Sequence, residues 1–278
     1  MNKKEKSKDK NITFEDEDKW REHVKTLVIQ GRLLELASAE HSDAVWKSFV
    51  FDMKKGTLKF LLNAQLDTLP TGANLVRWNK SSCDKCKQCG NRETTCHILN
   101  GCNVSLEQGK YTWRHDGIIN YIVKNVDTNK FKVYSDLPGQ MAGNGTIPVE
   151  DCVTSEKPDI VIIDQKRKTL DIFELTVPFE RNIEVRHKEK SDKYAHFVQD
   201  IRNYTTTVTA FEIGSRGYIS PSNKHRLHYL HKFLKAGITL PKFQQNISSL
   251  SIYSSYHIFI CRKDVGWAEP KLLEATIN

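Results

Sequence analysis

The chain has 278 residues, a length sufficient for two small domains or one larger domain with its own hydrophobic core. Hydrophobic residues make up 38% of it and charged residues 27%, as in ordinary globular proteins, and no apolar run is long enough to cross a bilayer. We therefore expect neither membrane insertion nor secretion. The formal net charge of +8 favours a polyanionic partner, because clustered Lys and Arg side chains release counterions from phosphates.

The first part of the chain predicts a disordered basic tail over residues 1–12 and a helical subdomain over residues 13–80. Nearly all of the first eleven residues are polar, and they include five lysines. Apolar side chains then recur at helical spacing, and the last such group ends before Pro70 and Gly72. The groups are Trp20, Val24, Leu27 and Val28, continued by Leu33, Leu34 and Leu36; Val45, Trp46 and Phe49; and Leu58, Phe60, Leu61, Leu62 and Leu66. We expect this subdomain to act as a scaffold.

Five of the seven cysteines lie within residues 83–102, and this clustering predicts a metal site. A disulfide framework would distribute its bridges along a small secreted chain instead. The three thiolates and one imidazole of a closed tetrahedral zinc site come from Cys86, Cys89, His97 and Cys102. Cys83 and Cys96 are surplus, and Cys83 with Cys86 is an alternative first pair, which leaves the ligand register open. We predict a structural zinc knuckle over residues 81–105; the alternative is a set of reduced cysteines without metal.

Residues 106–278 predict an α+β or α/β core. Their order of strand, strand, helix, strand and helix is typical of one sheet covered by helices. The segment from Leu250 to Ile260 is compatible with either a helix or a strand. The other expected elements are a helix from Tyr111 to Val123, a loop from Leu137 to Val153, strands from Ile160 to Ile163 and from Leu170 to Val177 joined by a hairpin turn, a long helix from Asn182 to Tyr204, a strand from Thr205 to Ile213, and a basic helix from Pro221 through Leu234.

Two acidic residues lie on the strands of the expected hairpin. Asp159 follows Lys157-Pro158 at the start of the first strand, and Glu174 lies inside the second. Carboxylates on neighbouring strands can converge on one Mg²⁺ ion, which lowers the pKa of an attacking water and neutralises the charge that develops during phosphodiester hydrolysis. Asp171 is the nearest competitor, but it is expected to face the other side of the strand.

A lysine on the next helix completes this group. No lysine stands beside Glu174, because the residue two positions later is Thr176. Lys190 instead shares one helical stripe with the apolar residues Ile183, Tyr194, Val198 and Ile201. Its ammonium, aimed at the sheet, could orient the nucleophilic water or stabilise the transition state. The alternative is a lysine whose stem packs while its charged end stays in water.

Taken together, these residues resemble the C-terminal region of non-LTR retrotransposon polyproteins, which carries a zinc knuckle and a restriction-like endonuclease of the PD-(D/E)XK type. The resemblance covers about residues 20–240 and consists of motifs that are specific only in combination. Besides the knuckle, the motifs are Asn91-Arg92-Glu93-Thr94, Gly109 to Asp116, Lys157-Pro158-Asp159-Ile160-Val161, Glu174 to Glu180, and Lys190-Ser191-Asp192-Lys193-Tyr194.

The resemblance implies that residues 106–278 form a restriction-like endonuclease domain with a central mixed sheet flanked by helices. Such a domain nicks target DNA so that the free 3′ hydroxyl primes reverse transcription. The site residues that it implies are Asp159 and Glu174 as magnesium ligands, Lys190 as the catalytic lysine, and Tyr194 in support. Members of the family often have Asp at the position of Glu174, so the longer side chain here changes the metal geometry slightly.

Further residues and partners follow from the same resemblance. Arg114 and His115 match a family motif, for which phosphate contact and helix packing are both open, and Lys193 is a further candidate for nucleic-acid contact. The implied partners are double-stranded DNA and, as a second candidate, the RNA of the element. The implied cofactors are a structural zinc ion and a catalytic magnesium ion. The implied location is the nucleus, after passage through the cytoplasm.

The chain also departs from the family pattern, because no reverse transcriptase motif is visible. We therefore expect a fragment, a truncated copy or a piece with its own start, with no reverse transcriptase domain. The rival function is a catalytically inactive zinc-knuckle protein that binds nucleic acid and derives from a decayed element. Retention of both acids and the helix lysine favours the enzyme, because folding alone does not need a buried charge cluster. Cleavage of branched Holliday-type junctions is a further alternative.

Overall fold

The computed structural model describes residues 14–27, 53–142, 145–151, 156–194, 201 and 203–270. The predicted basic tail and the helical segments around Leu33 and Trp46 lie outside the described residues. The helices are α1 (Phe14–Lys25), α4 (Lys55–Gln65), α5 (Gly72–Arg77), α6 (Asn103–Glu107), α7 (Lys110–Asn125), α8 (Ile183–Tyr194), α9 (Pro221–His231) and α10 (Leu240–Ile260), with a π-helical turn η1 (His97–Gly101) and a 3-10 turn η2 (Glu180–Asn182). The strands are β1 (Lys132–Ser135), β2 (Ile160–Asp164), β3 (Thr169–Thr176) and β4 (Thr205–Glu212).

The four strands form one mixed sheet in the order β1-β2-β3-β4. The β1/β2 and β2/β3 pairs are antiparallel, and β3 pairs in parallel with β4 after the crossover through α8. The Asp164 carboxylate accepts hydrogen bonds from the backbone N–H groups of Lys166 and Arg167, at 2.9 and 3.0 Å, which closes the β2–β3 turn. The predicted hairpin and the predicted mixed sheet with helices are therefore confirmed.

Both faces of the sheet are covered, since β2 is buried along its whole length and β3 at all but its two ends. Phe173, Leu175 and their neighbours pack against apolar residues of α7, α9 and α10. Ile172 and the residues beside it pack on the opposite side with Ile201. Glu174 lies on the same side of β3 as Ile172, because side chains alternate along a strand. The sheet therefore holds this carboxylate away from its larger apolar core.

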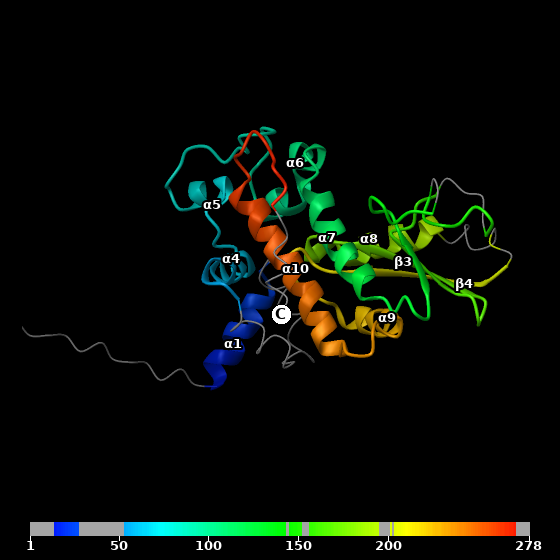
Figure 1. Cartoon of the computed structure of the whole chain (residues 1–278). Coiled ribbons are helices and arrows are strands. Elements are labelled where there is room, and N and C mark those ends of the chain that lie inside the picture. Colours follow the sequence, from blue (N-terminus) through cyan, green and yellow to red (C-terminus); the bar gives the residue numbers. More distant parts are fainter. Residues whose placement is uncertain are drawn as a thin grey trace, which may run out of the picture.

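The C-terminal helix α10 joins the two parts of the molecule. Figure 1 shows it between α4 and α5 on one side and the sheet with α9 on the other. Phe259 of α10 packs in one apolar cluster with Phe60 of α4, Leu99 of the cysteine-rich segment, and Phe179 beyond β3. The segment from Leu250 to Ile260, compatible with two structures in the sequence, is thus the second half of a helix of 21 residues.

Three details of the predicted elements are wrong. The long helix does not reach Tyr204, and the described part of α8 ends at Tyr194. Tyr204 directly precedes β4, where the backbone N–H of Thr205 donates to the Lys168 carbonyl and begins the parallel pairing. The basic helix ends at His231 rather than Leu234. The edge strand β1 was not predicted, since it has only four residues and its apolar and polar side chains show little alternation.

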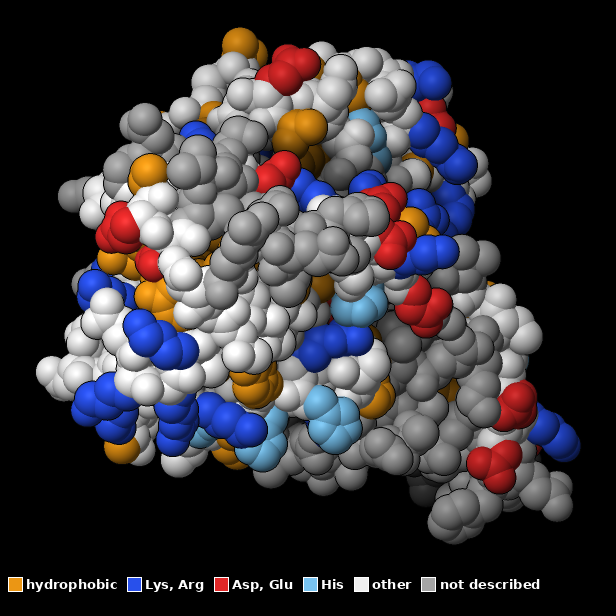
Figure 2. All heavy atoms as spheres, turned by 90° about the vertical axis from the view of Figure 1, so that its right-hand side faces the viewer, with side chains coloured by type: hydrophobic (Ala, Val, Ile, Leu, Met, Phe, Trp, Pro, Cys, Tyr) orange, Lys and Arg blue, Asp and Glu red, His pale blue; other side chains and the backbone are white. Residues whose placement is uncertain are grey.

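Charge is distributed unevenly over the surface. Figure 2 shows Lys and Arg side chains gathered at two borders of one face, with His side chains beside the lower group. Of the helices in the described ranges, none is both long and apolar enough to span a membrane.

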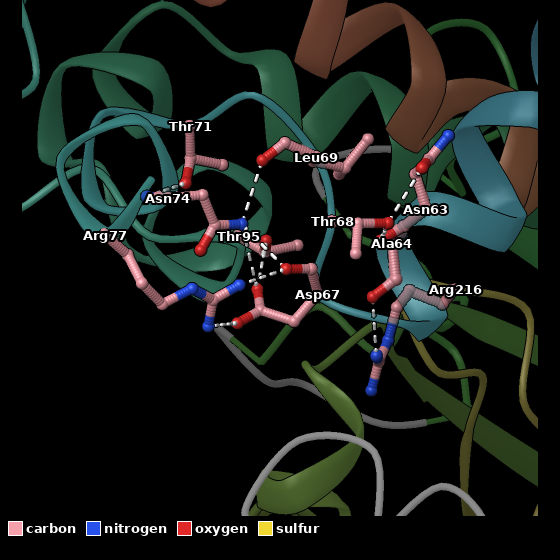
Figure 3. A network of polar contacts seen from close by, with 10 residues as sticks. All are labelled: Asn63, Ala64, Asp67, Thr68, Leu69, Thr71, Asn74, Arg77, Thr95 and Arg216. Carbon is pink, nitrogen blue, oxygen red and sulfur yellow. Dashed lines mark hydrogen bonds and ion pairs between the residues drawn. The ribbon is translucent and has the colours of Figure 1, made fainter. Parts of the chain in front are cut away.

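A buried ion pair fixes the loop after β4 to the segment after β3. The Glu180 carboxylate accepts hydrogen bonds from the backbone N–H and the Nε of Arg216, each at 2.7 Å, and both side chains are almost completely buried. Arg216 also donates to the carbonyl of Ala64 at the end of α4, at 3.1 Å (Figure 3). Gly214 permits this approach, because a Cβ there would lie 2.6 Å from a Glu180 oxygen. One guanidinium therefore connects the helical subdomain to the sheet.

Asp67 organises the turn that follows α4 (Figure 3). Its backbone carbonyl accepts hydrogen bonds from Asn74 and Arg77, both at 2.9 Å. Its carboxylate accepts one from Thr95 of the cysteine-rich segment, at 3.2 Å. Asp67 adopts a left-handed backbone conformation with φ of 52°, a region in which Asp is tolerated better than most residues. This turn thereby links α4 and α5 to the cysteine cluster.

We predict that Glu180→Gln destabilises the protein by about 3 kcal/mol, because it leaves the buried Arg216 guanidinium without its counter-charge. The free energy of unfolding from urea denaturation measures the change. Glu107→Gln, on an exposed side chain of α6, is the matched control, with an expected change within about 0.5 kcal/mol. Equal stability of the two variants would contradict the role given to the ion pair.

Candidate functional site

The cysteine-rich segment brings four potential metal ligands together. The ligand atoms of Cys86, Cys89, His97 and Cys102 all lie within 4.8 Å of one another. His97 Nε2 lies 3.3 Å from Cys89 Sγ. Three thiols and one imidazole at this separation are positioned to bind a metal, and the set is compatible with zinc in a closed tetrahedral site.

The local backbone explains how the four ligands meet. Cys86 and Cys89 lie on a tight turn, in which the Gly90 N–H donates to the Cys86 carbonyl at 2.9 Å. Gly90 has a φ of 75°, a conformation that favours glycine, and so allows the chain to reverse here. Tyr111 of α7 accepts a hydrogen bond from the Cys102 N–H at 3.1 Å and donates to the Ile98 carbonyl at 2.9 Å. The helix α7 is therefore attached directly to the ligand cluster.

The structure decides the ligand register that the sequence leaves open. Cys83 is exposed and lies outside the group of four. The Cys96 sulfur lies elsewhere, 3.4 Å from a guanidinium nitrogen of Arg181. The alternative first pair of Cys83 with Cys86 is thus not the one that the geometry assembles.

The electrostatics of this cluster also fit a bound cation. Burial, together with the neighbouring Cys86 and Cys102 thiols, raises the pKa of the Cys89 thiol to about 11. Crowded thiolates repel one another, and a divalent cation among them removes this cost. The donor set therefore suits a metal that keeps the three sulfurs deprotonated.

We predict about one zinc ion per purified chain, measured by elemental analysis. Cys102→Ser should abolish most of this zinc and lower the melting temperature, because a closed structural site needs all four ligands. Cys83→Ser is the matched control and should retain the metal. A metal-free wild-type protein, or equal loss in both variants, would contradict the assignment.

The second group of polar residues lies at the start of β2 and the end of β3. Asp159 and Glu174 adjoin each other across the two strands, since the Asp159 N–H donates to Glu174 Oε1 at 3.0 Å. Lys190 of α8 donates to Glu174 Oε2 at 2.6 Å and lies 3.8 Å from Asp159 Oδ2. The sequence-predicted acids and helix lysine are thus together. Asp171 lies apart and accepts a hydrogen bond from Tyr229 at 2.5 Å.

His115 joins this group from α7. Its Nε2 lies 3.2 Å from Asp159 Oδ2, and its Nδ1 lies 3.0 Å from the carboxylate of Asp116. The same Asp159 oxygen accepts a hydrogen bond from the backbone N–H of Leu175 at 2.7 Å. For His115 the sequence left phosphate contact and helix packing open, whereas its position allows it to act on Asp159 directly.

The protonation of the group follows from these contacts. Burial, and then the charge of Asp159, raises the pKa of Glu174, although Lys190 acts in the opposite direction. Burial alone would also raise the pKa of Asp159, but the hydrogen bond and charge of His115, together with the charge of Lys190 and the N–H of Leu175, outweigh it and lower that pKa. The two carboxylates are therefore inequivalent, with Asp159 the one that stays ionised most readily.

The remaining predicted site residues have different surroundings. The guanidinium of Arg114 is 2% exposed and donates to Ser255 at 2.9 Å and to the Val177 carbonyl at 3.1 Å, contacts that correspond to the packing alternative. Lys193 is exposed and forms an ion pair with Glu156 at 3.2 Å. The side chain of Tyr194 lies outside the described residues.

A second buried carboxylate holds α8 against the sheet. Glu212 at the end of β4 is 1% exposed and lies 2.7 Å from His187 Nδ1 of α8 and 3.3 Å from Arg226 of α9. Arg226 also lies 3.1 Å from His187 Nε2, so the imidazole lies between a carboxylate and a guanidinium. His187 is one turn before Lys190. The sequence offers no signal for this cluster, because its three members lie on three separate elements.

In magnesium-free protein, we predict that His115 titrates at about pH 9. Burial alone would lower its pKa, but the hydrogen bonds and charges of Asp116 and Asp159 outweigh it and raise the pKa from 6.5 to about 9. The stability that this charge contributes is therefore full below pH 6.5 and is lost as the pH rises through 9.

Imidazole proton resonances followed by NMR over this pH range measure the titration. Asp159→Asn should lower the pKa of His115, while the pKa of His257 in α10, which burial lowers, should not move. A His115 resonance that titrates at the usual value in wild-type protein would refute the contact with Asp159.

No known protein family and no curated protein sequence matches the chain. Its function is therefore inferred from its residues and their geometry.

Proposed function

We propose that the chain is the metal-dependent DNA endonuclease domain of a retrotransposon-derived protein, which nicks double-stranded target DNA for target-primed reverse transcription. The observation that carries the proposal is the convergence of Asp159, Glu174 and Lys190, joined by hydrogen bonds of 3.0 and 2.6 Å. Asp159 directly precedes β2, Glu174 lies in β3, and Lys190 lies on α8, where a helix lysine takes the place of the strand lysine in the simple nuclease motif. The resemblance of the surrounding motifs supports the same function.

The carboxylates have the chemistry of a magnesium site. Both offer hard oxygen ligands, which Mg²⁺ prefers. Glu174 is completely buried beside Asp159, and each carboxylate opposes ionisation of the other, so a bound divalent cation would stabilise both. Asp159 and Glu174 would hold the ion, which lowers the pKa of a water and neutralises charge on the phosphate when bound.

The protein groups around the carboxylates have separate parts in the reaction. The charges of Asp159 and Glu174 outweigh the effect of burial and raise the pKa of Lys190, which keeps its ammonium protonated. Such an ammonium can stabilise negative charge on the phosphate as it develops. His115 holds Asp159 in its ionised form and thereby keeps an oxygen ligand available. The zinc knuckle supports α7, from which His115 projects.

The proposal extends to partners and location. Double-stranded DNA is the substrate, the RNA of the element is a second candidate ligand, and the nucleus is the site of action after passage through the cytoplasm. The Lys and Arg side chains on the face in Figure 2 support a polyanionic partner.

We predict that Lys190→Ala and Asp159→Asn each reduce magnesium-dependent nicking of supercoiled plasmid by at least about 100-fold. Lys188→Ala, on an exposed lysine of the same helix, is the matched control and should leave the rate unchanged. Gel separation of supercoiled and open-circular plasmid measures the rate, and DNA binding by each variant is measured in parallel.

Two results would overturn the enzymatic assignment. One is equal nicking by wild-type and Asp159→Asn protein. The other is DNA binding by wild-type protein without any nicking, which would favour the zinc-knuckle binding protein instead. Faster cleavage of a branched junction than of linear duplex would identify the junction as the preferred substrate.

A further inference from the structure

Two hollows flank the contact between His115 and Asp159, and their charges are opposite. One, of about 410 Å³, lies between α7, the end of β3 and α8. Of the described residues that line it, four are basic and none is acidic: Arg114, His115, Arg186 and Lys190. The other, of about 240 Å³, is lined by Asp116, Asp136 and Asp159, and the shared His115 is the one basic side chain among its described lining residues. The site therefore has a cationic side and an anionic side.

The cationic hollow contains a buried charge that the protein balances poorly. Both hydrogen-bond acceptors of Arg114 are neutral oxygens, one from Ser255 and one from Val177. Its Nε has no hydrogen-bond partner among the described residues. The Tyr111 ring lies 5.5 Å from the guanidinium, and the Glu180 carboxylate, which pairs with Arg216, acts on it only at longer range. The buried charge is therefore compensated in part, and it leaves a positive potential in the space above it.

Arg186 supplies an accessible cation at the rim of the same hollow. Its side chain is 55% exposed, and it lies one turn before Lys190 on α8. Its ion pair with Glu189, at 2.7 Å, lies at the surface and contributes little to stability. The guanidinium is therefore free to exchange this partner for a phosphate, which it can contact through two N–H groups.

The rest of the lining suits a sugar-phosphate chain rather than a free ion. Leu106, Tyr111, Val177 and Pro178 offer apolar surface beside the basic groups. Deoxyribose rings can pack on such surface while the phosphates remain near the cations. Lys190 and His115 line this hollow and also contact the carboxylates, so the hollow adjoins the carboxylate site.

We propose that the cationic hollow is a subsite for a backbone phosphate of the nucleic acid, next to the phosphate that a divalent cation bound to Asp159 and Glu174 would hold. Arg186 contacts this neighbouring phosphate directly, and Arg114 adds its charge from beneath. The subsite rests on the proposed function for the identity of its ligand. The subsite also places the substrate: the nucleic-acid strand passes between α7 and α8, and the carboxylates lie on the opposite side of it from Arg186.

The test is the binding of a short duplex DNA of arbitrary sequence in magnesium-free buffer, measured by fluorescence anisotropy at several salt concentrations. Arg186→Ala should weaken binding about tenfold and reduce the slope of log affinity against log salt by about 0.9, because one phosphate contact is lost. Arg186→Lys should restore the salt slope. Arg167→Ala is the matched control: this arginine is exposed on the β2–β3 turn and lies 3.9 Å from Asp164.

Each outcome decides for or against the subsite. Wild-type affinity of Arg186→Ala, an equal loss in Arg167→Ala, or absence of duplex binding by the wild-type chain overturns it. Because magnesium is omitted, the assay measures DNA binding without cleavage. A chain that binds DNA through Arg186 yet never nicks plasmid keeps the subsite and loses the nuclease function. A chain that nicks normally while Arg186→Ala binds normally keeps the function and loses the subsite.

Discussion

The structure depends on the burial of carboxylates around the sheet, because an ionised group removed from water must be compensated nearby. Glu174, Glu180 and Glu212 are each almost completely buried, on β3, just beyond β3 and at the end of β4. Each is compensated by a cation or an imidazole from a different part of the chain. Lys190 of α8 pairs with Glu174, and Arg216 of the loop after β4 pairs with Glu180. Glu212 contacts His187 of α8 and Arg226 of α9.

This arrangement makes polar contacts, rather than apolar packing, the main attachment of α8. The sequence of α8 is strongly polar, and Ile183 at its start is its only side chain in the buried core among those described. Its contacts with the sheet run through Lys190 and His187, one turn apart. The position of the lysine is therefore set by its own ion pair with Glu174 and by the contact of His187 with Glu212. Polar contacts of this kind restrict the position of the Lys190 ammonium more than apolar packing of the helix would.

The sequence predicts local features of this molecule well, and tertiary features poorly. The β-branched run at Ile160, the turn at Asp164 and the spacing to Glu174 suffice to predict a hairpin with two facing acids, because strand alternation fixes which side chains share a face. Lys190 follows from helical periodicity. The choice between Cys83 with Cys86 and Cys86 with Cys89 as the first ligand pair could not be made, since both spacings suit a knuckle and only the folded turn at Gly90 separates them.

The hydrogen-bond partners of Arg114 and the grouping of His187, Glu212 and Arg226 were also out of reach. In each case the partners lie far apart in the sequence and meet only through the packing of α7, α8, α9 and α10. The short strand β1 was missed for a related reason. Its four residues become a strand because β2 offers an edge to pair with, and not because of their own pattern.

The helix α7 carries one further consequence. Tyr111 near its start hydrogen-bonds the backbone of the cysteine cluster, and His115, one turn later, contacts Asp159. The two sites are thus only four residues apart along a single rigid element. A change in the fold of the cysteine cluster would therefore shift α7 and move the His115 imidazole away from the Asp159 carboxylate.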